Sequence, residues 1–133
     1  MNNWVGGPGW DSSGPWRPNA GAGWKVYLKT GDMDSPGPSG TFVLLDERED
    51  SINDGYFVVD MAGYPSSGGQ WKIVDYPASY HNKAGGFSFA DGHAEIRKWK
   101  DKSITGKDAG IGGSIDKKVD DYLWLSQRTT TKL

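Results

Sequence analysis

The feature that most constrains this chain is an Asp-Gly pair between two short apolar segments. Asp91-Gly92 separates the stretch FSFA from the stretch HAEI. A type I′ turn needs positive φ at both central residues, which Asp and Gly tolerate, so the pair predicts a β-hairpin with a two-residue loop. In that register one face is apolar and the other polar, and a slip of one residue would ruin the pattern. The predicted apolar face consists of Phe87, Phe89, Ala94 and Ile96, and the polar face of Ser88, Ala90, His93, Glu95 and Arg97.

The composition favours a β-rich protein whose core is short of aliphatic side chains. The chain has 20 Gly and 7 Pro, which indicate many turns and long ordered loops. Leu, Ile, Val and Phe together number 23 of 133 residues, a low share that signals disorder only when net charge is high. The net charge is -2, and 7 Trp and 6 Tyr add apolar area. We therefore expect aromatic side chains to replace aliphatic ones in much of the core.

Apolar runs place the other predicted elements. Residues 41–46 and 56–63 each predict a buried strand, and we expect them to pair antiparallel across the acidic loop 47–55. Residues 70–77 predict a third, weaker strand, and residues 116–130 a short terminal helix. The fold class expected is α+β, mainly β. One domain would span residues 1–133, with a four- to five-stranded antiparallel sheet over 41–101, long Gly-rich loops and a Trp- and Gly-rich N-terminal loop over 1–23.

Charge and cysteine content limit the partners. The near-neutral net charge argues against nucleic acid, because phosphate neutralisation needs a clustered excess of Lys and Arg. The chain has no Cys, which removes disulfides, thiol catalysis and thiolate metal sites. The start of the sequence has neither the basic residues nor the apolar run of a signal peptide. No segment approaches the roughly 20 apolar residues that a membrane span needs, so we expect no span in this chain.

The only two histidines raise the question of a catalytic or metal centre. His81, His93, Asp91 and Glu47 are side chains of the types that a zinc or hydrolytic site uses. A small metal- or carboxylate-dependent hydrolase of esters or glycosides, centred on His81, Asp91 and His93, is therefore one hypothesis. The structural interpretation is that His93 lies exposed beside the hairpin turn, and that His81 hydrogen-bonds this turn from outside the sheet. The spacing alone leaves both open.

Two binding hypotheses come from other residue groups. Calcium takes six to eight oxygen ligands from a flexible loop, and the acidic segment with the strand after it supplies such oxygens. The predicted calcium ligands are Asp46, Asp50, Asn53, Asp54 and Asp60, against the alternative of a solvated acidic turn. Aromatic side chains in loops or at strand ends can stack on sugars. The glycan-binding candidates are Trp4, Trp10, Trp16, Trp71 and Tyr64, and the alternative is that these rings complete the core.

The spacing around the hairpin also carries a family resemblance. His81 is followed by nine residues and then Asp91-Gly92, and FVLLDEREDSINDGYFVVD precedes DYPASYHNKAGGFSFADGHAEIRKW in the same order. This pattern resembles the prepilin-like H-X9-DG family, whose members are related to type II secretion pseudopilins. The likeness covers most of residues 41–101, and MNNWVGG and WLSQRTT resemble members at either end.

The resemblance implies a globular domain with a small antiparallel sheet. In full-length members such a domain follows a cleaved and methylated apolar helix, which assembles filaments or secretion pseudopili, and this sequence does not contain that helix. The resemblance implies an extracytoplasmic location, periplasmic or at the cell surface, and partners among pilin-like subunits or secretion components. Related pseudopilins often hold C-terminal loops with calcium, which points the same way as the acidic segment. The function expected is therefore non-catalytic, with the hydrolase and a glycan-binding module as alternatives.

Overall fold

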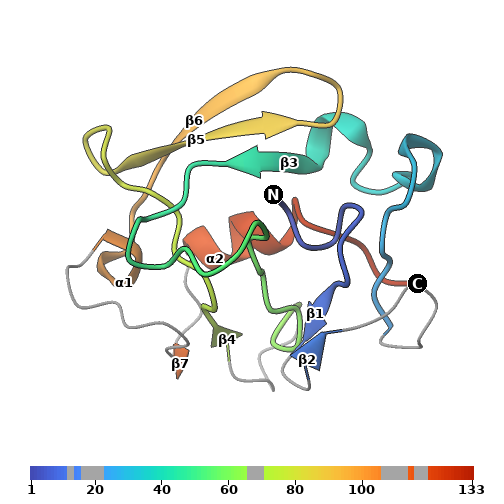
Figure 1. The fold of residues 1–133 in the computed structure, drawn as a ribbon, viewed down its shortest axis with the longest axis horizontal. Coiled ribbons are helices and arrows are strands. Elements are labelled where there is room, and N and C mark those ends of the chain that lie inside the picture. Colours follow the sequence, from blue (N-terminus) through green and yellow to red (C-terminus); the bar gives the residue numbers. More distant parts are fainter. Residues whose placement is uncertain (12–13, 16–22, 66–70, 106–113, 116–119) are drawn as a thin grey trace.

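The computed structural model describes residues 1–11, 14–15, 23–65, 71–105, 114–115 and 120–133. Figure 1 shows short strands and helices joined by long connecting segments. The strands are β1 (Trp10–Asp11), β2 (Gly14–Pro15), β3 (Phe42–Leu45), β4 (Trp71–Lys72), β5 (Ala84–Phe89), β6 (Ala94–Lys98) and β7 (Ser114–Ile115). The helices are α1 (Lys102–Thr105) and α2 (Asp120–Ser126), with 3₁₀ turns at Thr30–Asp32 and Pro38–Gly40. Among the described residues, no helix has the length and apolar character needed to cross a membrane.

The main sheet is antiparallel and has the strand order β3-β5-β6. Two further pairs, β1 with β2 and β4 with β7, contain only two residues per strand. A mainly β fold with some helix is thus confirmed. In the part of the chain that the structure describes, the main sheet has three strands, and the expected sheet of four to five stays a prediction.

The hairpin is present, but its predicted register is wrong by one residue. Ser88 pairs with Ala94 and Phe87 with Glu95, so the loop has three residues rather than two. The Phe89 N–H donates to the His93 carbonyl at 2.9 Å, and the Gly92 N–H donates back to Phe89 at 3.0 Å. Only Gly92 of the Asp-Gly pair has positive φ, at 93°, as a three-residue loop with a left-handed last residue requires. The shift moves Ile96 away from the phenylalanine face into solvent, where it is 75 % exposed.

The predicted partner of residues 41–46 is also wrong. The strand in this segment, β3, pairs with β5 rather than with residues 56–63, and its register shifts at a bulge between Phe42 and Leu44. Residues 56–63 form only isolated bridges: Phe57 with Asn2, and Val59 with Ile73. The expected central strand is therefore an edge of the sheet, and Leu44 is 53 % exposed. Residues 56–63 and residues 84–89 are both apolar enough to pair with β3, and only the tertiary fold distinguishes the two possible partners.

The core lies on one face of the sheet and is largely aromatic. Phe87 at the centre of β5 contacts Phe42, Trp99 and Trp124 edge-on, at ring centroid distances of 5.5, 5.8 and 5.0 Å. Edge-to-face geometry suits the charge distribution of aromatic rings, and each such pair adds about 0.5–1.5 kcal/mol beyond burial. The expectation that aromatic side chains replace aliphatic ones is confirmed. Trp124 belongs to α2, so these contacts join the sheet to the helix.

Helix α2 is anchored by a buried carboxylate. Asp121 is fully buried and accepts hydrogen bonds from the backbone N–H groups of Lys100 and Asp101, at 2.6 and 2.8 Å. Its other oxygen accepts from the Arg97 guanidinium at 3.0 Å. The carboxylate therefore ties the end of β6 to the start of α2. The predicted terminal helix is confirmed over Asp120–Ser126, whereas its expected first residues 116–119 lie outside the described residues.

The first residues of the chain fill the space beside β3. The Asn2 N–H donates to Val43 and the Phe57 N–H donates to Met1, so this segment lies between two parts of the chain that do not pair directly. The Asn2 side-chain amide donates to the carbonyls of Phe42 and Thr129, at 2.9 and 3.1 Å. The edge of β3 is thereby covered, whereas no described strand pairs with the opposite edge of the sheet, at β6.

Candidate functional site

The hairpin turn brings Asp91 and His93 together. Asp91 Oδ1 accepts the His93 backbone N–H at 3.1 Å and lies 2.5 Å from His93 Nδ1. His93 Nε2 lies 3.2 Å from Glu95 Oε1. The imidazole ring stacks on Phe89 with 4.3 Å between centroids and 8° between planes. Both ring nitrogens and one face of the ring are thus engaged by residues of the hairpin itself.

The electrostatics of this cluster are those of a mutually stabilising pair. The hydrogen bond to Asp91, followed by that to Glu95, raises the pKa of His93. The hydrogen bonds from the His93 side chain and backbone lower the pKa of Asp91. The hydrogen bond between the two side chains therefore favours a protonated imidazole and an ionised carboxylate, and this ion pair stabilises the turn.

His81 lies at the other end of β5. Its backbone N–H donates to the Ala84 carbonyl at 3.4 Å, in a loop where Asn82 and Lys83 both have positive φ. From Ala84 to Phe89 the strand covers roughly 17 Å, at about 3.4 Å per residue. Figure 1 shows this loop and the hairpin turn at opposite ends of the sheet. The structure therefore does not bring His81 and Asp91 together, either as one centre or through the predicted hydrogen bond to the turn.

The acidic residues predicted to bind calcium point to separate local partners. Asp46 Oδ2 accepts the Gly86 N–H at 3.2 Å, and Asp50 pairs with the Arg48 guanidinium. Asp54 accepts the N–H of residue 56 at 2.6 Å, and Asp60, which is buried, accepts that of residue 62 at 2.9 Å. Asn53 is exposed in the same loop. Over the described ranges, no three carboxylate or imidazole side chains gather in a way that would hold a metal ion, and calcium binding stays a prediction.

Sequence reasoning missed one pair of carboxyl groups, that of the buried Asp75 and the half-buried Glu47. Asp75 is 3 % exposed, and its Oδ2 accepts the Val58 N–H at 2.5 Å. Burial, together with the charge of Asp54, raises the pKa of Asp75 to about 6. Burial and the negative charge of Asp75 raise the pKa of Glu47 to about 7. The alternation of residues 70–77 places Asp75 on the same face as Ile73, which was the signal for its burial.

Two carboxyl groups with raised pKa values are the equipment of a glycosidase, but this pair has no room for a sugar. The void beside Asp75 is lined by Phe57, Ile73 and Tyr122, among others, and holds only ≈ 10 Å³. That volume is at the limit for a single water molecule. The pair therefore lacks a cleft, and its raised pKa values reflect burial.

The aromatic residues proposed for glycan binding fall into different environments. Trp4 is fully buried, and its Nε1 donates to the Val59 carbonyl at 3.1 Å, so it belongs to the core. Trp10 and Tyr64 are half-buried. Trp16 and the side chain of Trp71 lie outside the part of the chain described. The candidates therefore do not form one exposed platform.

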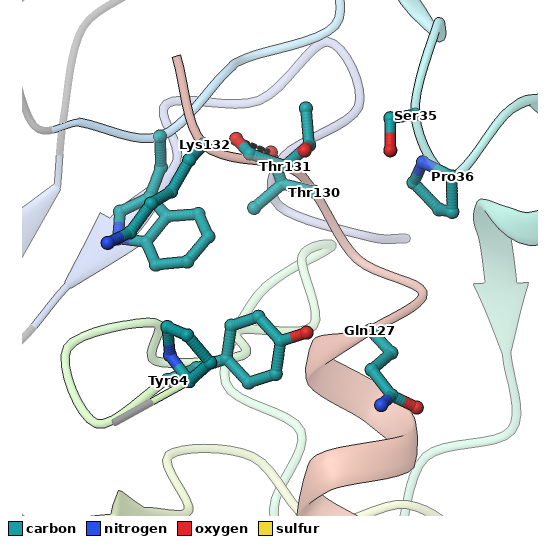
Figure 2. Close-up of a pocket in the computed structure, with 9 residues that line it drawn as sticks. Ser35, Pro36, Tyr64, Gln127, Thr130, Thr131 and Lys132 are labelled. Carbon is teal, nitrogen blue, oxygen red and sulfur yellow. Dashed lines mark hydrogen bonds between the residues drawn. The ribbon is translucent and has the colours of Figure 1, made fainter. Parts of the chain in front are cut away.

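Tyr64 nevertheless borders a surface hollow. The hollow holds ≈ 230 Å³ and is lined by Trp24, Ser35, Pro36, Tyr64, Pro65, Gln127, Thr130, Thr131 and Lys132. Figure 2 shows the Tyr64 hydroxyl on the side that faces Gln127, with Lys132 and the threonines across the opening. The ring of Trp24 packs against Tyr64 at 5.8 Å and is itself only 8 % exposed. Tyr64 is therefore the ring available for stacking, with amide and hydroxyl groups around it.

The outer face of the main sheet carries exposed apolar side chains near the hairpin. Leu44, Ser88 and Ala94 form one row across the three strands, and Gly86 with Ile96 forms the next. Leu44 and Ile96 are 53 % and 75 % exposed, and the small residues of β5 leave a low strip between them. Exposed apolar side chains grouped on one face indicate an interaction surface more often than singly scattered ones do.

Comparison of the chain with models of protein families, with curated proteins and with solved structures finds no match.

Proposed function

We propose that this chain is a non-catalytic, pseudopilin-like extracytoplasmic domain that contacts pilin-like subunits or components of a type II secretion or pilus-like system. The observation that carries the proposal is the use made of the His-to-Asp-Gly signature. Asp91 and His93 bond to each other and to the hairpin, and His81 lies at the far end of β5. Residues so arranged hold a turn in shape, which is what a presenting domain requires. A sheet of four to five strands, as the sequence predicts, belongs to the same proposal.

The outer face of the main sheet is the surface on which such contacts would form. Leu44 on β3 is exposed and apolar, and the chain has no Cys, so a Leu44→Cys variant carries a single thiol for a cross-linker. In cells with the secretion or pilus-like system, we expect this variant to cross-link to a pilin-like subunit, identified by mass spectrometry. Leu28→Cys is the matched control, because Leu28 is 63 % exposed but lies outside the sheet. Equal cross-linking from both positions, or none from Leu44→Cys, contradicts the proposal.

Catalysis is tested on the same protein. Under the proposal, the wild-type chain turns over no chromogenic ester or glycoside, and His93→Ala lowers only the melting temperature. The hydrolase alternative predicts turnover that is abolished by His93→Ala or His81→Ala while the fold survives. Turnover of that kind would replace the proposed function.

Glycan binding is a second candidate, favoured by the hollow beside Tyr64. An oligosaccharide that stacks on Tyr64 would change the fluorescence of Trp24 beneath it, since the two rings are in contact. The expected result is quenching by at least one member of an oligosaccharide panel, lost in Tyr64→Ala and kept in Tyr80→Ala, an exposed tyrosine elsewhere. No change across the panel removes this candidate.

A further inference from the structure

Strand β6 presents an open edge with a regular pattern of backbone groups. The bonds from Phe89 N–H to His93 and from Trp99 N–H to Lys83 set the alternation of the ladder with β5. The backbone groups of residues 93, 95, 97 and 99 therefore face β5, and those of 94, 96 and 98 face away. No other described strand lies beside β6, and Figure 1 shows it as the outermost strand of the sheet. Beyond Lys98 the edge closes, because Asp121 takes the N–H groups of residues 100 and 101.

We propose that two copies of this chain associate through β6, antiparallel about a twofold axis at Ile96, into one continuous six-stranded sheet. The outward-facing residues then form the hydrogen-bonded pairs: Ile96 with the partner's Ile96, and Ala94 with the partner's Lys98. The twofold axis repeats the second pair, as Lys98 with the partner's Ala94. The three pairs supply about six backbone hydrogen bonds, two for each pair. The inference stands apart from the proposed function, because it needs neither the family resemblance nor the outer contact at Leu44.

Charge selects this register over its neighbours. About the Ile96 axis, Glu95 lies opposite the partner's Arg97, and the same pair recurs on the other side of the axis. Side chains of pairs without backbone bonds lie closer together, so the two ion pairs are well placed. Shifting the axis by one residue places Glu95 opposite the partner's Glu95, or Arg97 opposite the partner's Arg97. Like charges directly opposite destabilise a sheet, so both shifted registers are disfavoured.

The Arg97 side chain is 23 % exposed and therefore accessible to such a partner. Its guanidinium gives one bond to Asp121 and lies 5.0 Å from the centroid of the Trp124 ring. Arg128 also lies over this ring, 4.3 Å from its centroid, so two cations contact the same aromatic side chain. In the proposed dimer, the carboxylate of the partner's Glu95 would form an ion pair with the Arg97 guanidinium.

The interface is small, and the dimer should be correspondingly weak. Interfaces below about 1,200 Å² belong to transient complexes, and pairing of five residues per strand falls in that class. We expect a dissociation constant on the order of 10–100 μM, with the dimer growing steadily with concentration. The exposed Ile96 side chains also meet at the axis, which adds apolar burial on the outer face.

Sedimentation equilibrium across 5 μM to 1 mM, roughly bracketing that range, tests the proposal. Ile96→Pro removes the outward N–H at the axis while leaving the ladder with β5 intact, and should weaken dimerisation at least about tenfold. Ile96→Thr keeps the N–H and should have a smaller effect. Glu95→Arg places like charges opposite each other and should weaken the dimer similarly. Glu49→Arg makes the same charge change at an exposed loop residue and should leave dimerisation unaltered.

The register has its own readout. In a sample that mixes differently isotope-labelled copies, we expect an intermolecular nuclear Overhauser contact between the Hα atoms of Glu95 and the partner's Arg97. Circular dichroism of each variant checks that the fold survives. A chain that stays monomeric up to 1 mM overturns the proposal. So does a dimer whose stability is unchanged by both Ile96→Pro and Glu95→Arg.

Discussion

The two faces of the β3-β5-β6 sheet are built from the same strands but do opposite things. On the inner face, Phe42, Phe87 and Phe89 are nearly or fully buried, and Phe87 packs against Phe42, Trp99 and Trp124 of α2. On the outer face, the residues that alternate with them are small or exposed: Leu44, Gly86, Ser88, Ala94 and Ile96. Buried contacts in this sheet are therefore concentrated on one side, and no described strand pairs with the β6 edge.

The largest expected effect breaks the inner face. Phe87→Ala removes the ring at the centre of the aromatic cluster and should lower the free energy of unfolding by about 3–5 kcal/mol. Ile96→Ala, on the outer face of the neighbouring strand, should change it by no more than about 0.5 kcal/mol. Urea unfolding of both variants at low protein concentration measures the contrast. Similar losses in the two variants would show that the faces are not so divided.

Two adjacent glycines sharpen the comparison. A Cβ added at Gly85, on the inner face, would lie 2.7 Å from the Ala78 carbonyl oxygen, which is already bonded to Trp99 Nε1. Gly85→Ala should therefore cost about 1–3 kcal/mol through overpacking. A Cβ at Gly86, on the outer face, would meet the Asp46 carboxylate at 2.9 Å, and that side chain can rotate into solvent. Gly86→Ala should cost less than about 1 kcal/mol, partly offset by a stiffer unfolded chain. Thermal unfolding ranks the pair, and the reverse order contradicts the assignment of faces.

The buried carboxyl of Asp75 should make stability depend on pH. Its folded pKa of about 6 exceeds the unfolded value near 3.9, so the native state binds the proton more tightly. Stability from this group is then present at low pH and lost as pH rises from about 4 through 6. Asp75→Asn should reduce the change in the free energy of unfolding between pH 4.5 and 8 by about 1 kcal/mol. The reduction is modest because water still screens part of the charge interaction between Asp75 and Glu47. Asp34→Asn is the control. Asp34 is exposed and its pKa is lowered, so this carboxyl titrates below this pH range. An unchanged slope in Asp75→Asn refutes the assignment.

The exposed turn at the end of the hairpin should give the smallest effect, and the effect should depend on pH in a different way. The raised pKa of His93 means that its contribution is full below about 6.5 and is lost as pH rises through the folded value. The lowered pKa of Asp91 means that its contribution is full above about 3.9 and is lost on acidification. The turn should therefore be most stable between these limits. In the wild type, the chemical shifts of Gly92 and Glu95 should change at the higher pH values where His93 loses its proton. His93→Gln should remove this change, and His81→Gln should leave it in place. A Gly92 shift that does not titrate in the wild type would sink this assignment.

The sequence located the hairpin, the terminal helix and the aromatic core, because each leaves a local signal. Its hairpin register failed for a physical reason: Asp-Gly serves a two-residue loop and equally a three-residue loop with Gly in the left-handed position. The alternation of residues within β6 could not decide between the two registers. Ala94 and Ile96 are apolar, which is typical of core residues, yet the residues that face the core include Arg97. Packing on Trp124 and bonding to Asp121 make that arginine acceptable on the inner side.

The candidate site was less accessible to sequence reasoning because it depends on distance. The spacing of His81 and Asp91 permits a shared centre, but β5 runs straight between them and holds them apart. Asp75 and Asp121 were missed although each carried a signal: Asp75 shares a strand face with Ile73, and Asp121 lies one helical turn before buried Leu125. Which acids become buried depends on the long-range pairing of Glu47 with the segment around Pro77.

The central claim is that β6 pairs with β5 so that Ile96 stays in water and its backbone faces outward. In a dilute sample, nuclear Overhauser spectra of the chain test it directly through contacts between Hα atoms across the hairpin. We predict contacts of Ser88 with Ala94 and of Gly86 with Ile96. Contacts of Phe89 with Ala94 and of Phe87 with Ile96 would contradict it, since that register turns Ile96 into the core.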